Sequence, residues 1–193
     1  MTEKEKQQKG LLYYGSDQEL SADRDAAKQL CYEFNFSSPA DSEKRREILA
    51  KLFGSAGKGI WIEPMFQCDY GYHIHVGDNF YVNHNCVMLD CAPIRFGDNV
   101  LVGPNCGFYT AGHPLDVERR TQWLEYAKPI HVGNNVWFGG NAVVLPGVTI
   151  GDDVVIGAGS VVTKDIPSGV LAAGNPCKVI REITEEDKKS FNR

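Results

Sequence analysis

Apolar side chains recur along most of this chain at a spacing of six residues. The positions that carry the repeat are Val76, Val82, Met88, Phe96, Val102, Phe108, Val132, Phe138, Val144, Ile150, Ile156 and Val162. A spacing of six fits neither an amphipathic helix nor a simple alternating strand, so it indicates an internal structural repeat. Small or apolar residues also stand two positions earlier, as at Ile74 and Phe80, so each repeat is expected to bury two side chains.

Turn-forming residues stand between the repeats. A glycine follows many of the repeat positions, and pairs such as Asp78-Asn79 and Asp98-Asn99 come next. These residue types enter left-handed backbone conformations at the least cost. The pattern therefore predicts a mainly β protein, in which short strands joined by tight corners stack into a parallel β-helix. At three repeats per coil, the twelve repeat positions predict about four coils.

The chain before the repeat, residues 1–54, has a helical pattern. One apolar face is formed by Leu20, Ala27, Leu30, Cys31 and Phe34, and a second helix is expected around Ile48 to Phe53. Ser38, followed by a proline, is the expected N-cap of that second helix. Short one-sided helices are marginal alone, so this segment is expected to pack on the first coils.

The repeat divides the rest of the chain. It predicts a β-helix over residues 55–168 and a C-terminal extension, residues 169–193, that ends in a short helix. The repeat is interrupted only at residues 109–129 and resumes in phase at Ile130, which indicates a loop inserted between coils. Long ordered loops in compact domains are usually functional.

The repeat, of the form (Leu/Ile/Val)-Gly-x-x-small-x, resembles that of the hexapeptide-repeat O-acetyltransferases. Within that family the chain is most similar to the maltose and galactoside O-acetyltransferase branch. That similarity rests on Cys68-Asp69-Tyr70-Gly71-Tyr72, Asn79-Phe80-Tyr81, Gly112-His113-Pro114, Asn135-Val136-Trp137 and Ala173-Gly174-Asn175-Pro176. The resemblance implies a left-handed β-helix, acetyl-CoA as acyl donor, a small sugar as acceptor, and a homotrimer with active sites between subunits.

Two residues are the expected catalytic groups. His113 lies in the inserted loop between glycine and proline, and an imidazole can take a proton near neutral pH. The resemblance makes it the base that deprotonates a sugar hydroxyl during direct attack on the thioester, without an acyl-enzyme. It assigns Asn83 to orienting the acceptor and stabilising the oxyanion. The alternatives are an ordinary surface histidine and a corner asparagine that satisfies the backbone.

Sugar recognition is expected to use carboxylates, which accept from hydroxyls, and an aromatic ring. The expected acceptor-binding residues are Asp17, Asp69, Tyr81, Asn83, Asp90 and Glu125. Asp69 stands where the galactoside enzymes carry serine, and Cys91 where they carry a second aspartate. Residues 86–91 instead resemble the maltose branch. Maltose-type acetylation is therefore favoured over a galactoside or another hydroxyl acceptor.

For acetyl-CoA the resemblance points to the coils after the loop. Trp137 would pack on the pantetheine arm, and small residues would leave room for it. Side chains late in the chain would hold the phosphates. The expected coenzyme residues are Trp137, Gly139, Gly140, Ala158, Thr163, Lys164, Lys178 and Arg181. The alternatives are coil packing or a subunit contact for Trp137, and a solvated face for Lys178 and Arg181.

Composition narrows the possibilities further. The 193 residues are 42% hydrophobic and 23% charged, as in one soluble globular domain, and the net charge of -5 argues against nucleic-acid binding. The polar start and the lack of any run near ~18 apolar residues argue against a signal peptide or membrane span, so a cytoplasmic protein is expected. The six cysteines form no C-x-x-C pair, which favours buried free thiols.

Two other functions remain open at this stage. A γ-class carbonic anhydrase uses the same type of β-helix and binds zinc through three histidines. The five histidines, His73, His75, His84, His113 and His131, lack the closely spaced pair of that class, so no metal is expected. A non-catalytic hexapeptide scaffold is the second alternative, and the presence of His113, Asn83 and Trp137 argues against it.

Overall fold

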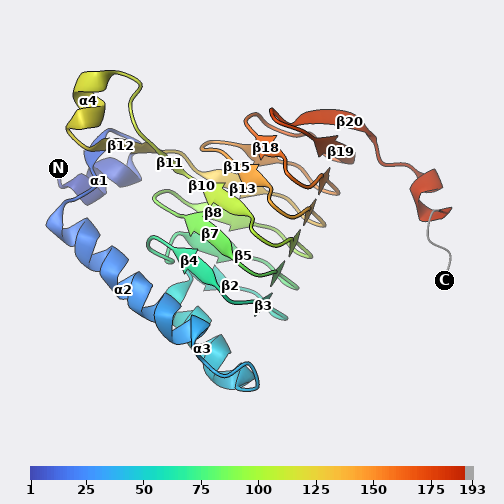
Figure 1. Cartoon of the computed structure of the whole chain (residues 1–193), viewed down its shortest axis with the longest axis horizontal. Helices are drawn as coiled ribbons and strands as arrows, with labels where there is room; N and C mark the ends of the chain where they lie inside the picture. The colour runs from blue at the N-terminus through green and yellow to red at the C-terminus, as the bar shows by residue number, and fades with distance from the viewer. Residues whose placement is uncertain (190–193) are drawn as a thin grey trace.

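The computed structural model describes residues 1–189 and shows a stack of parallel coils with helices along one side (Figure 1). Each coil contributes one strand to each of three sheets, named here by their first strands. The β2 sheet contains β2 (Ser55–Ala56), β5 (Ile74–Val76), β8 (Ile94–Phe96), β13 (Ile130–Val132) and β16 (Thr149–Ile150). The β4 sheet contains β4 (Phe66–Cys68), β7 (Cys86–Leu89), β10 (Gly107–Tyr109), β15 (Val143–Val144) and β18 (Val161–Val162). The β3 sheet contains β3 (Trp61–Ile62), β6 (Tyr81–Val82), β9 (Leu101–Val102), β14 (Trp137–Phe138), β17 (Val155–Ile156), β19 (Val170–Ala173) and β20 (Lys178–Glu182).

The stack has one coil more than the repeat predicts. The first coil, β2 to β4, pairs in register with the second, and Ala56, Ile62 and Cys68 keep the six-residue spacing, although Ala56 is exposed where later coils bury an apolar side chain. The stack also extends past residue 168, because β19 pairs with β17 in parallel. The predicted boundary between the β-helix and the C-terminal extension therefore lies too early.

Asparagine holds the corners between coils. Asn79, Asn99 and Asn135 adopt positive φ angles of 55 to 58°. The side-chain amide of each donates to the residue one coil above: Asn79 to Asn99, Asn99 to Asn135, and Asn135 to Asp153, each at 2.9 Å. The residue type that tolerates this backbone conformation thus also links neighbouring coils.

The core is a column of inward-facing apolar side chains. Phe80, Phe96, Phe108 and Phe138 follow one another with ring centroids 4.8, 5.0 and 5.1 Å apart. Phe96 and Phe108 lie in one coil, and Phe80 and Phe138 lie in the coils below and above it, so the rings link successive coils. This column gives the surface residues a rigid support.

The two ends of each strand in the β4 sheet define two edges that run along the stack. The "Asn83 edge" consists of the corners that enter this sheet, residues 83–85, 103–105, 139–141 and 157–159. The "Asp69 edge" consists of the segments that leave it, residues 69–73, 90–93 and 110–129. The inserted loop belongs to the Asp69 edge and contains β11 (Ala111–Gly112), α4 (Val117–Thr121) and β12 (Leu124–Ala127).

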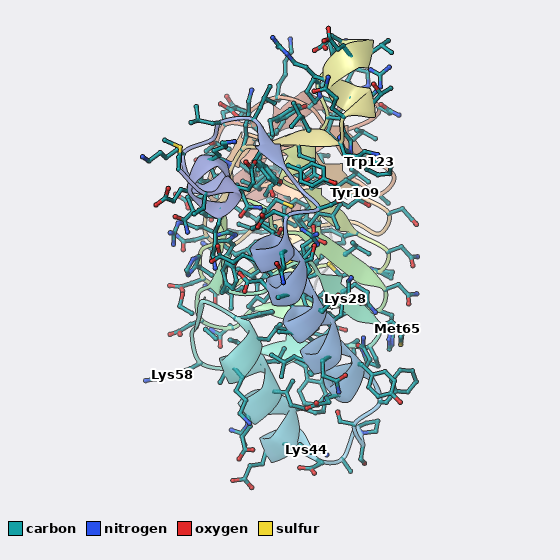
Figure 2. The ribbon with its side chains drawn as sticks, turned by 90° about the vertical axis from the view of Figure 1, so that its left-hand side faces the viewer. Lys28, Lys44, Lys58, Met65, Tyr109 and Trp123 are labelled. Atoms are coloured by element: carbon teal, nitrogen blue, oxygen red, sulfur yellow. The ribbon has the colours of Figure 1, made fainter. Side chains whose placement is uncertain are left out.

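The N-terminal segment packs against the Asp69 edge and the first coils. It contains α1 (Glu3–Gln8), β1 (Tyr13–Tyr14), α2 (Gln18–Asn35) and α3 (Ser42–Leu52). Helix α2 runs along the stack, with Lys28 between Tyr109 above and Lys44 below (Figure 2). The Asn35 side chain fixes its end by pairing with the backbone N–H and C=O of Phe66, both at 2.8 Å. Helix α3 begins at Ser42 and is capped by Asp41, so the expected cap at Ser38 is wrong.

The last strand, β20, lies at the edge of the β3 sheet. Strand β20 returns antiparallel to β19, and a 3₁₀ helix (Glu185–Lys189) follows it. The last four residues of the predicted C-terminal extension lie outside the described residues. Within residues 1–189, no helix has the length and apolar character that a membrane crossing requires.

Candidate active site

His113 follows β11 in the inserted loop, and its ring is held from one side. Its Nδ1 lies 2.9 Å from the carbonyl oxygen of Leu124, on the neighbouring strand β12. A carbonyl can only accept, so Nδ1 carries the proton and Nε2 has the free lone pair. The side chain is exposed, and within residues 1–189 Nε2 has no hydrogen-bond partner. The imidazole is therefore oriented to accept a proton at Nε2.

The strand that orients His113 also places Glu125. Strand β12 pairs antiparallel with β1 of the N-terminal segment, and Tyr13 donates from its hydroxyl to Glu125 Oε2 at 2.8 Å. The glutamate carboxylate lies directly over Gly15, where an added Cβ would come within 2.5 Å of it. A glycine at position 15 is thus needed for this approach, and it leaves Glu125 half-buried on the Asp69 edge.

Asp69 lies on the same edge, one coil below Cys91. The Cys91 thiol donates to Asp69 Oδ2 at 3.3 Å. Burial raises the pKa of Asp69, while the Cys91 hydrogen bond and the Arg24 charge oppose that effect. The two positions singled out by the sequence are therefore in direct contact, with the carboxylate on the lower coil.

Asp90 is placed differently from expectation. Its side chain is fully buried, at 0% exposure, and Oδ1 accepts from the backbone N–H groups of Asp69 and Tyr70 at 2.9 and 2.8 Å. Desolvation raises the pKa of Asp90 to about 6. A side chain without solvent exposure cannot receive a sugar hydroxyl, so the expected acceptor contact of Asp90 is corrected to support of the Asp69 backbone.

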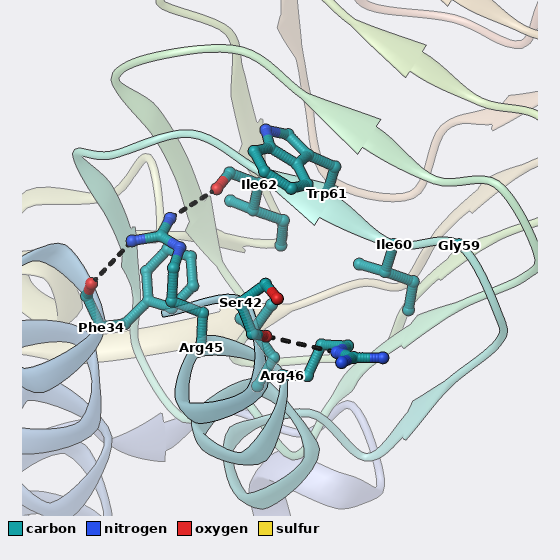
Figure 3. A pocket seen from close by; sticks show the side chains of 9 residues that line it. Phe34, Ser42, Arg45, Arg46, Gly59, Ile60, Trp61 and Ile62 are labelled. Atoms are coloured by element: carbon teal, nitrogen blue, oxygen red, sulfur yellow. Dashed lines mark hydrogen bonds between the residues drawn. The ribbon is translucent and has the colours of Figure 1, made fainter. Parts of the chain in front are cut away.

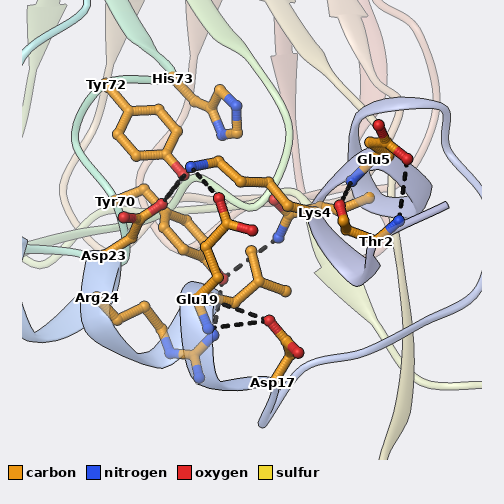
Figure 4. Close-up of polar contacts among 12 residues, drawn as sticks. Thr2, Lys4, Glu5, Asp17, Glu19, Asp23, Arg24, Tyr70, Tyr72 and His73 are labelled. Atoms are coloured by element: carbon orange, nitrogen blue, oxygen red, sulfur yellow. Dashed lines mark hydrogen bonds and ion pairs between the residues drawn. The ribbon is translucent and has the colours of Figure 1, made fainter.

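Arg24 on α2 belongs to this region, although the sequence offered no signal for it. Its guanidinium donates to the Tyr70 hydroxyl at 2.7 Å and to the Gly15 carbonyl at 2.6 Å, and it lies over the Tyr70 ring (Figure 4). It is the positive charge that faces Asp69 and Glu125. Its spacing along α2 is that of an ordinary surface arginine, so only the packing of α2 on the coils reveals it.

Asp17 caps the first turn of α2. It is the N-cap of α2, and its Oδ1 accepts from the N–H groups of Glu19 and Leu20 at 3.0 and 3.4 Å (Figure 4). The other carboxylate oxygen, Oδ2, accepts no hydrogen bond from residues 1–189. Asp17 therefore keeps one oxygen for a ligand.

Asn83 and Tyr81 do not lie on the Asp69 edge. They flank the corner before β7, on the Asn83 edge, and the four-residue strand β7 separates this corner from Asp90 by about 13 Å. Asn83 Oδ1 accepts from the His84 N–H at 2.8 Å, as the corner alternative requires, which leaves Nδ2 to donate elsewhere. Within one chain, Asn83 and His113 stand at opposite ends of the β4 sheet.

Most of the expected coenzyme residues lie on the Asn83 side. Trp137 projects from the β3 sheet and is 53% exposed, while Gly139, Gly140 and Ala158 form the corners that follow. A Cβ on Gly139 would lie 2.5 Å from the Ala158 nitrogen, so glycine is required there for the coils to stack. Ala158 is exposed and Gly140 half-exposed, so they still leave a shallow surface next to Trp137.

The late polar residues are divided between the two sides. Thr163 and Lys164 are exposed and follow β18, on the last coil, above the Asp69 edge. Lys178 and Arg181 lie on β20 beside the β3 sheet. The Arg181 guanidinium is already paired with both carboxylate oxygens of Asp187, at 2.6 and 2.9 Å. One chain therefore does not bring these four residues together.

Another cavity lies elsewhere and contains none of the expected residues. It measures about 400 Å³ and lies between α3 and the first coil, lined by Arg45, Arg46, Ile60 and Trp61 among others (Figure 3). The buried Arg45 donates to the carbonyl oxygens of Phe34 and Ile62 and to the Ser37 hydroxyl. Within residues 1–189 of one chain, no three His, Cys, Asp or Glu side chains form a group able to hold a metal ion.

Comparison with known proteins agrees with this architecture. Residues 6–57 match the family described as the maltose acetyltransferase hexapeptide capping motif, and residues 129–164 match the family described as bacterial transferase hexapeptide (six repeats). The galactoside O-acetyltransferase of Escherichia coli (strain K12) is 47% identical over 182 residues, which cover 94% of this chain and 90% of that protein.

Two solved structures extend the match to the whole fold. A maltose O-acetyltransferase from Clostridium difficile 630 superimposes with a TM-score of 0.94 and 52% identity, covering 96% of this chain and 99% of that one. A galactoside acetyltransferase in complex with coenzyme A gives a TM-score of 0.95 and 45% identity, covering 100% of this chain and 96% of that one.

Proposed function

Because the chain belongs to the maltose and galactoside O-acetyltransferase family of left-handed β-helix acetyltransferases, we propose that it transfers an acetyl group from acetyl-CoA directly to a sugar hydroxyl. The observation that carries the proposal is the orientation of His113. With Nδ1–H donating to Leu124, Nε2 is free to act as general base. Asp69 and Glu125, on the same edge, would accept from other hydroxyls of the sugar.

The proposed chemistry is a single acyl transfer. His113 Nε2 takes the proton of the attacking hydroxyl as its oxygen bonds to the thioester carbon. The C–S bond of the tetrahedral intermediate then breaks, and the departing sulfur receives the proton from His113. A donor to the oxyanion of that intermediate commonly contributes ~3–4 kcal/mol, and Asn83 Nδ2 is the proposed donor.

We propose that Asn83 is supplied by a second copy of the chain, in a homotrimer. The outward-facing columns on two sheets are largely apolar: Trp61, Tyr81, Leu101, Trp137 and Val155 on the β3 sheet, and Val87, Gly107, Val143 and Val161 on the β4 sheet. The column on the β2 sheet is polar. Packing an apolar face of one copy on the next would bring the Asn83 edge of one subunit to the Asp69 edge of its neighbour.

The same arrangement would complete a coenzyme site. Trp137, Gly140 and Ala158 of one subunit would hold the pantetheine arm, with Gly139 needed for coil stacking. The residues proposed to contact the phosphates are Thr163, Lys164 and Lys178. Arg181 would bind a phosphate only after its ion pair with Asp187 is broken. Acetyl-CoA is the proposed donor, since coenzyme A occupies a related acetyltransferase of the same fold.

Maltose is the proposed type of acceptor, with a galactoside as the competing candidate. The support is the carboxylate at Asp69 combined with a thiol, rather than a carboxylate, at Cys91. Incubating maltose, glucose or a thiogalactoside with the protein and acetyl-CoA, followed by mass spectrometry, tests both candidates. Acetylation of the thiogalactoside alone would reverse the choice of acceptor, and no acetylated product from any hydroxyl compound would refute the transferase.

The role of His113 has a direct test. His113→Ala is expected to lower kcat by roughly 10²–10⁴-fold, because the general base is lost, with little change in the affinity for CoA. His75→Ala removes an imidazole from the β2 sheet and serves as the matched control. Turnover by His113→Ala at the control's rate would exclude His113 from the mechanism.

Mixing two inactive variants tests whether the site is shared. His113→Ala and Asn83→Ala subunits, unfolded together and reassembled in equal amounts, are expected to recover about a quarter of the wild-type sites, since an interface is intact when each partner supplies its unaltered residue. If each site lay within one chain, every site would lack one group. Mixed samples would then remain as inactive as the separate variants.

A further inference from the structure

A second cavity, of about 330 Å³, lies between α1 and the polar outer face of the β2 sheet. Three nitrogen-bearing side chains, His73, Arg95 and His131, line it together with Gln7. Ala92 and Pro129 are among the apolar residues that complete its wall. Among the described residues that line it, none is an aspartate or glutamate. Its size is within the range of small-molecule sites.

The positive charge of this pocket is not balanced locally. Arg95 and His131 are register partners on β8 and β13, which places their side chains about 4.8 Å apart on adjacent coils. Neither forms an ion pair within residues 1–189. Burial lowers the pKa of His73, its hydrogen bond to the Asp90 carbonyl opposes that effect, and the nearby charges of His75, Lys4 and Arg95 lower the pKa further. An anion in the pocket would pair with the Arg95 charge.

Gln7 provides a second, independent sign of a missing ligand. Its side chain is 2% exposed; Nε2 donates to the Tyr70 hydroxyl at 3.3 Å, while Oε1 has no partner within residues 1–189. If the amide is turned over, Oε1 can accept the Tyr70 proton, and Nε2 becomes the unsatisfied group. Either way, one buried amide atom of a pocket-lining residue lacks a protein partner, which is costly. A carboxylate can only accept, so it would satisfy Gln7 in the turned-over orientation, in which Nε2 donates to it.

We propose that this pocket binds a small organic carboxylate, with its anionic group between Arg95 and His131 and its carbon chain against Ala92 and Pro129. The apolar wall favours an organic acid over inorganic phosphate. Arg95 and His131 lie on the polar β2 sheet, whereas Ala92 and Pro129 belong to the Asp69 edge. Cys91, which contacts Asp69, is also in the lining, but His113 and Glu125 are not.

Calorimetric titration of the full-length protein with succinate, in the absence of CoA and sugar, tests the proposal. Saturable binding is expected with a Kd on the order of 1 mM, and Arg95→Gln is expected to weaken it at least tenfold. His75→Gln is the matched control, because His75 stands next in the same column but outside the pocket. It is expected to bind as the wild type does. Circular dichroism and size-exclusion chromatography establish that each variant is folded and assembled.

Other probes identify the ligand class and the location. Succinamide, which keeps the carbon chain without the charge, is expected not to bind, and phosphate is expected to bind more weakly than succinate. His113→Ala is expected to retain full succinate binding. Equal binding of phosphate or succinamide, insensitivity to Arg95→Gln, or loss of binding in His113→Ala would each overturn the proposal. None of these outcomes bears on acetyl transfer, which is tested separately.

Discussion

Asp90 is expected to make the stability of this protein fall as the pH rises. Its carboxylate has no solvent exposure, and its Oδ2 accepts no hydrogen bond within residues 1–189. The two backbone N–H groups on Oδ1 stabilise the charge only in part, so burial raises the pKa from the usual 3.8 to about 6. Between these two values the native state keeps a proton that the unfolded chain has lost.

The size of the effect follows from the change in pKa. At 1.36 kcal/mol for each tenfold change in proton affinity, moving the pKa from 3.8 to about 6 costs about 3 kcal/mol at neutral pH. The free energy of unfolding should therefore fall as the pH rises through this window and level off above pH 6. Roughly 2 kcal/mol of the change lies between pH 4.5 and 7.5, where the fold is more easily studied.

Asp90→Asn isolates this contribution. The amide keeps an oxygen for the N–H groups of Asp69 and Tyr70 but cannot ionise, so the dependence should disappear. Urea unfolding at fixed protein concentration, from pH 4.5 to 7.5, gives the difference between variant and wild type. Asp98→Asn is the control, because Asp98 Oδ1 also accepts a backbone N–H, from Asp78 at 2.7 Å, but at an exposed corner. A wild-type-minus-variant difference that stays constant over this range would refute the reasoning.

Two further predictions concern the stack itself. Phe108→Ala should lower the free energy of unfolding by about 3–5 kcal/mol, because it removes a fully buried ring from the middle of the aromatic column. A loss under about 1 kcal/mol in denaturant unfolding would contradict that account. Gly139→Ala should cost about 1–3 kcal/mol, since its Cβ would lie 2.5 Å from the Ala158 nitrogen. Gly140→Ala, where the nearest atoms are 3.3 Å away, is the control, and equal melting temperatures for the two variants would show that the close approach is not what requires glycine.

The regular part of the fold was predictable because each coil buries side chains at the same positions of its repeat. An inward side chain at every sixth position is the register partner of its equivalent on the next coil, as Val82 is of Val102, so the spacing predicts the strand register. The predicted β-helix began at residue 55, but the first coil was not counted among the repeat positions because its first inward position is an exposed alanine, Ala56. Phe66 in this coil is the register partner of Cys86 and also packs with Phe53 from the end of α3.

The candidate site was predictable only where its residues interrupt a pattern. His113 was found because it lies in the inserted loop. Arg24 carries no such mark, since one arginine on a polar helix face looks like any other until α2 is docked. The acceptor contact expected for Asp90 was wrong because its place in a family motif says nothing about burial. The carboxylate is buried and accepts a hydrogen bond from the backbone N–H of Asp69.

The N-terminal segment and the inserted loop depend on each other for their structure. Strand β12 has partners on both sides: β11, which ends beside His113, and β1, which begins at the buried Tyr13. The backbone oxygen that orients the His113 ring belongs to Leu124, the register partner of Tyr14. The loop interrupts the coils and has no coil neighbour to fix it, so β1 supplies the missing edge pairing. The N-terminal segment is therefore part of the framework of the candidate site as well as a cover for the first coil.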